Sequence, residues 1–205
     1  MTDATARPPG TDVIPRPAAS LLVLRGGGPE VLMGMRGAKH KFMPNRLVFP
    51  GGAVDPADHG AAVASPLRGD VVRRLEKAAS PELAHALGVA AARELEEETG
   101  LSLGGPPALH GLDYLCRAVT PAPSPVRFDA RFLVVEAAHV SGVLAGSGEL
   151  DDLRWWGIEE ALAMDLAGPQ RLVLGRLQLW LAMSEAERRG QSEVPVLDQR
   201  AWEFE

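Results

Sequence analysis

The sequence is organised around the stretch Arg93-Glu94-Leu95-Glu96-Glu97-Glu98-Thr99-Gly100-Leu101. On a helix, Glu94, Glu97 and Glu98 share one face because they are spaced three and four residues apart. Gly100 stands where a helix C-cap glycine belongs, so the three carboxylates fall in the last turns of that helix. The stretch therefore predicts a helix that carries a cluster of negative charge at its C-terminal end.

This placement of the carboxylates is unfavourable for the helix alone. Each negative charge near a helix C-terminus costs about 0.3–1 kcal/mol against the macrodipole. Like charges four residues apart add a few tenths of a kcal/mol. A bound cation would remove both costs, and carboxylate oxygens are the ligands that Mg2+ prefers. The pattern thus favours a divalent-metal site over a merely solvated acidic face.

The same stretch resembles the second half of the Nudix box, Arg-Glu-U-x-Glu-Glu-x-Gly-U, where U is a bulky apolar residue. All seven specified positions match. The resemblance implies an α/β/α sandwich with a mixed sheet, and a hydrolase that needs Mg2+ or Mn2+. It also implies that Glu94, Glu97 and Glu98 bind metal, and that Glu97 takes part in catalysis. We expect Arg93 to orient the carboxylates, because Arg93 and Glu97 form an i, i+4 pair on the helix.

A glycine pair upstream extends the resemblance. The apolar run 47–49 predicts a short strand, and Pro50, Gly51 and Gly52 follow it. Glycines at such a point let the backbone turn sharply and approach a ligand closely. In the Nudix family a glycine pair opens the box, and a backbone carbonyl there helps to hold the metal. We therefore expect Gly51 at the metal and Gly52 at the substrate.

The first half of the box departs from the family pattern. That pattern places five residues between the glycine and a first glutamate, and seven more before the arginine. Here Gly52 and Arg93 lie 41 positions apart rather than 14, and the residue eight before Arg93 is His85. We therefore expect a helical insertion over about 55–80. The first glutamate is missing or supplied from elsewhere, and Glu82 is the nearest substitute in sequence.

Two further groups are candidates for the site. Glu149 lies in an acidic loop before a predicted strand, as in many Nudix proteins, and is a candidate additional metal ligand or general base. An ordinary exposed acidic loop is the alternative. Arg36 and Arg46 flank a basic loop over 37–45, which could form a cationic rim for a phosphorylated substrate or could simply be solvated charge.

Isolated histidines are weaker candidates for metal binding. His40 lies in the basic loop and His59 in the insertion, without the spacing of a histidine metal site. We therefore expect neither to bind the metal.

The substrate is less determined than the reaction. Nudix hydrolases cleave a diphosphate linked to another moiety, X. The run 49–58 is similar to that of members acting on coenzyme A or its esters, and Arg36 supports this in part, but the fuller Leu-Arg-x-His-x-Gly pattern is absent. Nucleotide sugars, dinucleotide polyphosphates and nucleoside triphosphates stay open. A non-catalytic Nudix-like module that binds a nucleotide for regulation is the alternative, although the three intact glutamates favour catalysis.

The composition of the chain limits the classes of partner and the cellular location that we expect. The 205 residues carry a net charge of −6, which argues against a broad nucleic-acid-binding surface. The single cysteine, Cys116, excludes an internal disulfide, fits a reducing cytoplasm and is expected to be buried. Neither a signal peptide nor a membrane span is expected. We expect a small diphosphate substrate, no nucleic-acid polymer, no membrane, and leave a homodimer open.

Hydrophobic periodicity gives the remaining organisation. Residues 1–17 are rich in proline and are expected to form a flexible lead-in, and 18–205 a single domain. The segment 190–205 has no helical pattern and is expected to be a tail or a partner contact. Gly88 is a candidate break in the acidic helix. Strands are expected over 18–25, 30–36, 109–119 and 126–137, and helices over 70–79, 81–99, 158–164 and 169–189.

Overall fold

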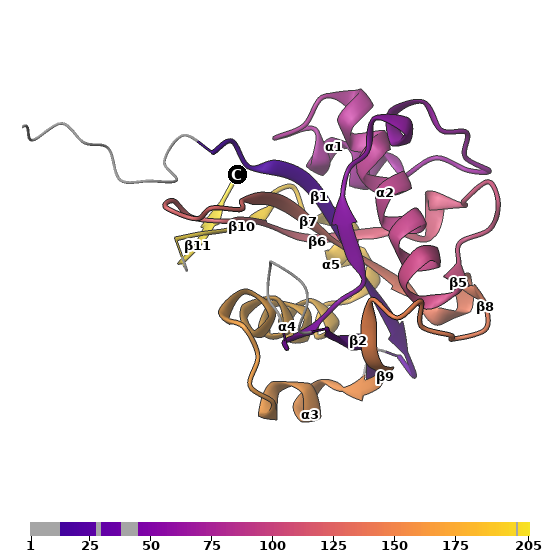
Figure 1. Cartoon of the computed structure of the whole chain (residues 1–205). Coiled ribbons are helices and arrows are strands. Elements are labelled where there is room, and N and C mark those ends of the chain that lie inside the picture. Colours follow the sequence, from indigo (N-terminus) through magenta and orange to yellow (C-terminus); the bar gives the residue numbers. More distant parts are fainter. Residues whose placement is uncertain (1–12, 28–29, 38–44, 200) are drawn as a thin grey trace, which may run out of the picture.

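A mixed β-sheet lies between two layers of helices in the computed structural model, as Figure 1 shows. The structure describes residues 13–27, 30–37, 45–199 and 201–205. The sheet order is β11-β10-β6-β7-β1-β2-β3, with β4 also paired to β1 and β9 to β2. The expected α/β/α sandwich with a mixed sheet is confirmed. The strands of this sheet are β1 Arg16–Arg25, β2 Glu30–Arg36, β3 Leu47–Val48, β4 Gly51–Ala53, β6 Asp113–Val119, β7 Phe128–Glu136, β9 Leu150–Gly157, β10 Pro195–Asp198 and β11 Ala201–Phe204.

Strand β1 is the centre of the sheet. It runs parallel to β7, antiparallel to β4 over its first half and antiparallel to β2 over its second. Its apolar run is buried on both faces: Leu21 and Val23 point to one layer of helices, and Leu22 and Leu24 to the other. A strand covered on both faces is expected to be continuously apolar, which explains the run.

The acidic helix α2 spans Pro81–Thr99, as predicted. The Ser80 hydroxyl caps it by accepting a hydrogen bond from the Leu83 amide at 3.2 Å. Gly100 ends it in the left-handed conformation, with φ of 72°. The expected break at Gly88 is wrong, because the helix runs through it. Gly88 serves packing, since a Cβ there would lie 3.0 Å from the Leu109 side chain.

The insertion is docked on the sheet next to α2. It contains the 3-10 helix η1, Pro56–Gly60, and helix α1, Gly69–Leu75, which ends earlier than the expected 70–79. Arg68, just before α1, donates to the carbonyls of His110 and Leu112 at 3.0 and 3.1 Å. The buried Arg131 of β7 donates to the Ala78 carbonyl at 2.7 Å. These contacts fix both ends of α1 against the sheet.

The predicted helix over 169–189 is two helices. Helix α4 spans Gly168–Leu181, and α5 spans Glu185–Gly190. Ser184 begins α5 in a capping box, in which the Glu187 carboxylate accepts from the Ser184 amide at 2.7 Å. A Ser followed three residues later by Glu is a helix-start signal, which the apolar periodicity obscured.

The expected tail over 190–205 is also wrong. Strand β10 pairs in parallel with β6, with Leu197 opposite Ala118, and β11 adds antiparallel to β10 at the edge of the sheet. Val196 and Leu197 are buried. Strands of four residues carry too few alternations to be recognised in the sequence, and their pairing with β6 stabilises them here.

Smaller differences concern boundaries. Strand β1 begins at Arg16, so the expected lead-in over 1–17 ends inside the sheet, where Arg16 and Pro17 pair with β7. The expected strand over 109–119 begins with the 3-10 helix η2, Leu109–Gly111, before β6. The remaining elements are β5 Leu101–Ser102, β8 Ser141–Gly142, the 3-10 helix η3 Ala137–His139 and helix α3 Ile158–Ala163. Within the described ranges, no helix combines the length and apolarity needed to cross a membrane.

The core between α2 and β1 gives a stability prediction. Leu87 of α2 is fully buried, so Leu87→Ala should lower the free energy of unfolding by about 2–5 kcal/mol. Leu179 of α4 is 60% exposed, so Leu179→Ala should change it by less than about 0.5 kcal/mol. Urea denaturation of both variants measures the difference. Equal midpoints would contradict the placement of α2.

Candidate active site

The end of α2 meets the glycine turn of β4. The Glu98 carboxylate is buried, 3% exposed, and accepts a hydrogen bond from the Gly51 amide at 2.9 Å. A Cβ at Gly51 would lie 2.6 Å from Ser20 of β1, and one at Gly52 would overlap the Glu94 carboxylate. Only glycines therefore allow the turn to fit between β1 and the two glutamates.

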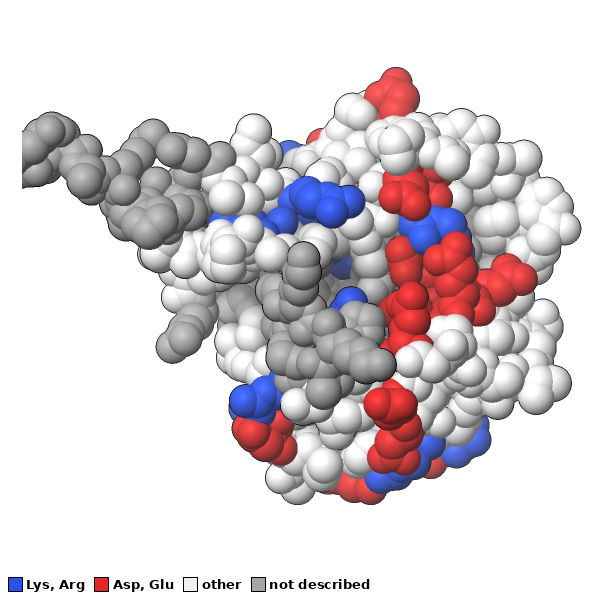
Figure 2. Space-filling model, in the orientation of Figure 1, with Lys and Arg blue, Asp and Glu red and all other residues white. Residues whose placement is uncertain are grey.

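Negative charge is concentrated at this junction. Burial raises the pKa of Glu98 to about 7; the charges of Glu94 and Glu149 add to the rise, while the Gly51 hydrogen bond and Arg36 oppose it. Burial likewise raises the pKa of Glu94, against the effect of Arg93. Figure 2 shows the acidic side chains as a band over the face that carries α2.

Two residues distant in sequence join the cluster because β9 pairs with β2. Leu150 lies opposite Arg36 in that ladder, so Glu149 comes to the end of β2. Glu149 is exposed, whereas the Nε atom of Arg36 is buried without a hydrogen-bond partner among the described residues. Both lie within electrostatic range of Glu98. The pairing of β9 with β2 thus brings a carboxylate, Glu149, and a guanidinium, Arg36, close to the α2 carboxylates.

Arg93 links the carboxylates to the glycine turn. Its guanidinium bonds both oxygens of Asp58 at 3.1 Å, Glu94 at 2.8 Å and Glu97 at 3.2 Å. It also donates to the Ala53 carbonyl at 3.0 Å. The predicted contact between Arg93 and Glu97 is present. The bonds to Asp58 first, and then to Glu94, raise the pKa of Arg93.

Asp58 occupies the place of the missing box glutamate. It is the sixth residue after Gly52, where the family pattern has its glutamate, and it is 2% exposed. The expectation of Glu82 is not met: Glu82 lies exposed at the start of α2 and hydrogen-bonds Ser80. Counting forward from Gly52 finds Asp58, whereas counting back from Arg93 crosses the insertion and misses it.

Other predicted residues lie apart from the cluster. The Arg46 guanidinium pairs with the Asp165 carboxylate and donates to its carbonyl at 3.0 Å. His59 is exposed in η1. His40, with most of the basic loop, lies outside the described residues.

The cluster has the donor chemistry for a hard divalent cation. Its groups are carboxylate oxygens: Glu98 is buried, Glu94 is partly buried, and their charges repel each other. Among the residues that the structure describes, no three His, Cys, Asp or Glu side chains are already gathered closely enough to hold an ion. Arg93 holds Glu94 and Glu97 instead. By their chemistry Glu94 and Glu98 fit such an ion, and Glu97 and Glu149 lie within electrostatic range of Glu94.

Comparison with known proteins agrees with this geometry. The family model for the NUDIX domain matches residues 82–177. The putative nudix hydrolase 7 of Caenorhabditis elegans is 28% identical over 202 residues, covering 90% of this chain and 68% of the relative. A NUDIX hydrolase structure from Alicyclobacillus acidocaldarius aligns with a TM-score of 0.63 and 26% identity, over 84% of this chain and 98% of that one. The chain therefore carries a NUDIX domain and is similar to Nudix hydrolases in sequence and in fold.

The same fold is also seen in a MutT NUDIX hydrolase from Burkholderia pseudomallei. That structure has a TM-score of 0.53 and 21% identity, over 80% of this chain and 98% of the other. The matched NUDIX segment begins at Glu82, within α2. It therefore leaves out the glycine turn and Asp58, which the three-dimensional structure adds to the site.

The link through Arg93 gives a prediction. Asp58→Asn removes the carboxylate that holds Arg93, so we expect hydrolysis to fall about tenfold or more, in line with losses of outer groups around metal ligands. Asp55→Asn is the matched control, because Asp55 is exposed and 3.9 Å from Arg93. Steady-state kinetics of both variants test this. Equal rates would show that Asp58 does not position the site.

The raised pKa of Glu98 gives a second prediction. Between the ordinary pKa of about 4.5 and the folded pKa of about 7, the folded state retains a proton that the unfolded state has lost. The metal-free protein should therefore lose stability as pH rises through this window, and level off above it. Glu98→Gln should remove that part of the loss. Urea midpoints in chelator at several pH values measure it, and parallel curves for both proteins would refute it.

Proposed function

We propose that this protein is a Nudix hydrolase that uses Mg2+ or Mn2+ to cleave the pyrophosphate bond of a nucleoside diphosphate linked to another moiety. The observation that carries the proposal is the pair of carboxylates held against the Gly51–Gly52 turn, of which Glu98 is buried and Glu94 is partly buried. Buried negative charge without an equal number of cations is costly, and a divalent ion would neutralise it. The similarity to the Nudix family supports the reaction type.

Each residue of the cluster has a proposed role. Glu94, Glu97 and Glu98 would hold the ion together with the Gly51 carbonyl. The ion would supply charge neutralisation at the phosphates and a lowered pKa for the attacking water. Glu149 is exposed beside this position, so it is the better placed acceptor for the proton of that water, with Glu97 as the other candidate. Arg93 would orient Glu94 and Glu97 rather than contact substrate.

Arg36, at the end of β2, is the proposed phosphate contact. It lies within electrostatic range of Glu98, and no described carboxylate bonds the Nε atom of its guanidinium. Gly52 is the proposed backbone contact for the substrate, because its lack of a side chain lets the turn approach the Glu94 carboxylate closely. Arg46 is paired with Asp165, so its contribution would require exchange of that ion pair.

The insertion supports a proposal about moiety X. A cavity of about 400 Å3 lies beside α2, and Arg93 and Glu97 line it together with Pro107. The insertion holds its wall, because the Ala64 amide donates to the Pro107 carbonyl at 2.9 Å. We assign the non-phosphate part of the substrate to this cavity. Coenzyme A esters, nucleotide sugars and dinucleotides are the candidate classes.

Partners and location complete the proposal. The substrate is a small molecule rather than a nucleic-acid polymer, and the buried thiol of Cys116 suits a reducing cytoplasm. A homodimer is a candidate assembly, and no membrane association is proposed.

A nucleotide-binding regulatory module is the second candidate. Arg93 already pairs with Glu94 and Glu97, which would suit a site that binds a nucleotide without metal chemistry. The two functions differ in turnover. Phosphate release across a panel of diphosphate compounds, with Mg2+ or Mn2+, separates them, and binding without hydrolysis of any compound would favour the module.

The metal assignment gives a direct prediction. Glu98→Gln should reduce turnover about a hundredfold or more at saturating Mg2+, because it removes a charge that holds the ion. Glu82→Gln is the matched control: Glu82 is on the same helix, is exposed, and hydrogen-bonds Ser80 instead. Circular dichroism should be unchanged for both. Near-wild-type turnover of Glu98→Gln would overturn the assignment.

A further inference from the structure

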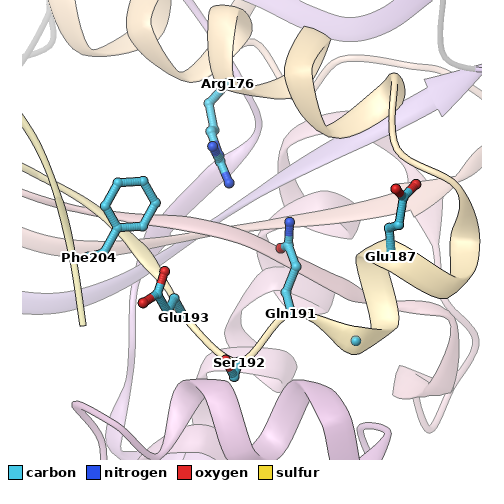
Figure 3. Close-up of a pocket in the computed structure, with 7 residues that line it drawn as sticks. Arg176, Glu187, Gln191, Ser192, Glu193 and Phe204 are labelled. Carbon is cyan, nitrogen blue, oxygen red and sulfur yellow. The ribbon is translucent and has the colours of Figure 1, made fainter.

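A second cavity lies on the face of the sheet opposite α2. It is open to solvent, has a volume of about 410 Å3 and is bordered by α4, the end of α5 and β11, as Figure 3 shows. Helix α4 packs on Leu22 and Leu24 of β1, whereas α2 packs on Leu21. The cavity is therefore separated from the active site by the sheet. Its lining consists of Arg176, Glu187, Gly190, Gln191, Ser192, Glu193 and Phe204.

Arg176 is the cation of this cavity. Its side chain extends from α4 into the space between Gln191 and Phe204 (Figure 3). The described residues give it neither a hydrogen bond nor an ion pair, and its Nε atom is buried. Arg74 lies within electrostatic range, and its own hydrogen bond goes to the carbonyl of Tyr114. Arg176 is therefore the guanidinium of the cavity lining, and no described carboxylate is bonded to it.

Two other groups add specificity. The Oε1 atom of Gln191 is buried without a donor, while the amide nitrogen of the same side chain contacts the Met183 sulfur at 2.9 Å. The ring of Phe204 is 59% exposed, and its centroid is 6.0 Å from the Arg176 guanidinium. The cavity therefore presents a cation and an aromatic face, beside a buried amide oxygen.

The two acidic residues of the lining, Glu187 and Glu193, form no ion pair with Arg176 among the described residues. The Glu187 carboxylate accepts hydrogen bonds from the Ser184 amide and hydroxyl, both at 2.7 Å, in the cap of α5. Figure 3 shows it turned away from Arg176. Glu193 carries the only carboxylate of the lining without a hydrogen bond to the described residues, and it stands beside Phe204 in the figure.

We propose that this cavity binds a small organic anion that carries a flat ring. The phosphate or carboxylate of the ligand bonds the Arg176 guanidinium, for which planar two-point recognition is favourable. The ring of the ligand packs on Phe204. Because the site lies across the sheet from the metal cluster, the ligand binds without contacting the substrate.

Calorimetric titration of the full chain in chelator tests the proposal. Phenyl phosphate and benzoate are the probes, and benzyl alcohol supplies the ring without the charge. We expect both anions, but not the alcohol, to bind wild-type protein, and the stronger of the two identifies the preferred anionic group. Arg176→Met keeps the aliphatic packing and should weaken binding about ten- to a hundredfold.

Two variants make the result decisive. Glu193→Gln removes a repulsive charge, so it should strengthen binding of both anions. Weaker binding in that variant would overturn an anionic ligand, since it would indicate a ligand group attracted to Glu193. Glu94→Gln should leave binding unchanged. Loss of probe binding in Glu94→Gln would place the probes at the metal cluster and refute the site. Unchanged probe binding in Arg176→Met would also refute it, because the probes would then bind elsewhere. The site is likewise refuted if phenyl phosphate or benzoate does not bind the wild-type protein.

Discussion

The burial of the Glu98 carboxylate against the Gly51 amide is the constraint on which the site depends. A carboxylate at the end of a helix is opposed by the helix dipole and by desolvation. It is kept there by a backbone that comes close enough to donate to it. That closeness requires glycine at two successive positions, and a central strand that holds the turn in place. The fold around β1 therefore serves to bring α2 and β4 together.

Arg93 turns this contact into a fixed arrangement. One guanidinium binds Asp58, Glu94 and Glu97 at once, so the orientation of the α2 carboxylates depends on a residue in η1. The greater part of the insertion follows Asp58, and its contacts with β7 and the β6 region anchor it independently. A long addition is thereby accommodated inside the motif while Arg93 keeps its bond to Asp58. The same addition contacts Pro107, which lines a cavity beside the cluster.

Local patterns predicted the elements that carry chemistry better than those that close the sheet. Helix α2 was predictable to both ends because Ser80, Pro81 and Gly100 are capping signals. Asp58, the partner of Arg93, was missed because a count of residues back from Arg93 crosses the insertion. Strands β10 and β11 were missed since each has four residues. Their stability comes from pairing with strands far away in sequence, which leaves no local pattern.

The sequence by itself determined the groups of the candidate site: a helix with carboxylates on one face, a glycine pair after a strand, and an arginine at the start of the acidic stretch. These follow from helical spacing and from the conformational freedom of glycine, both of which are local. Only the tertiary structure decided that Asp58 bonds Arg93, and that Glu149 and Arg36 meet the cluster through the pairing of β9 with β2. It also separated Arg46 from the site by giving it Asp165. Contacts between distant segments depend on packing and register, which no single stretch of sequence encodes.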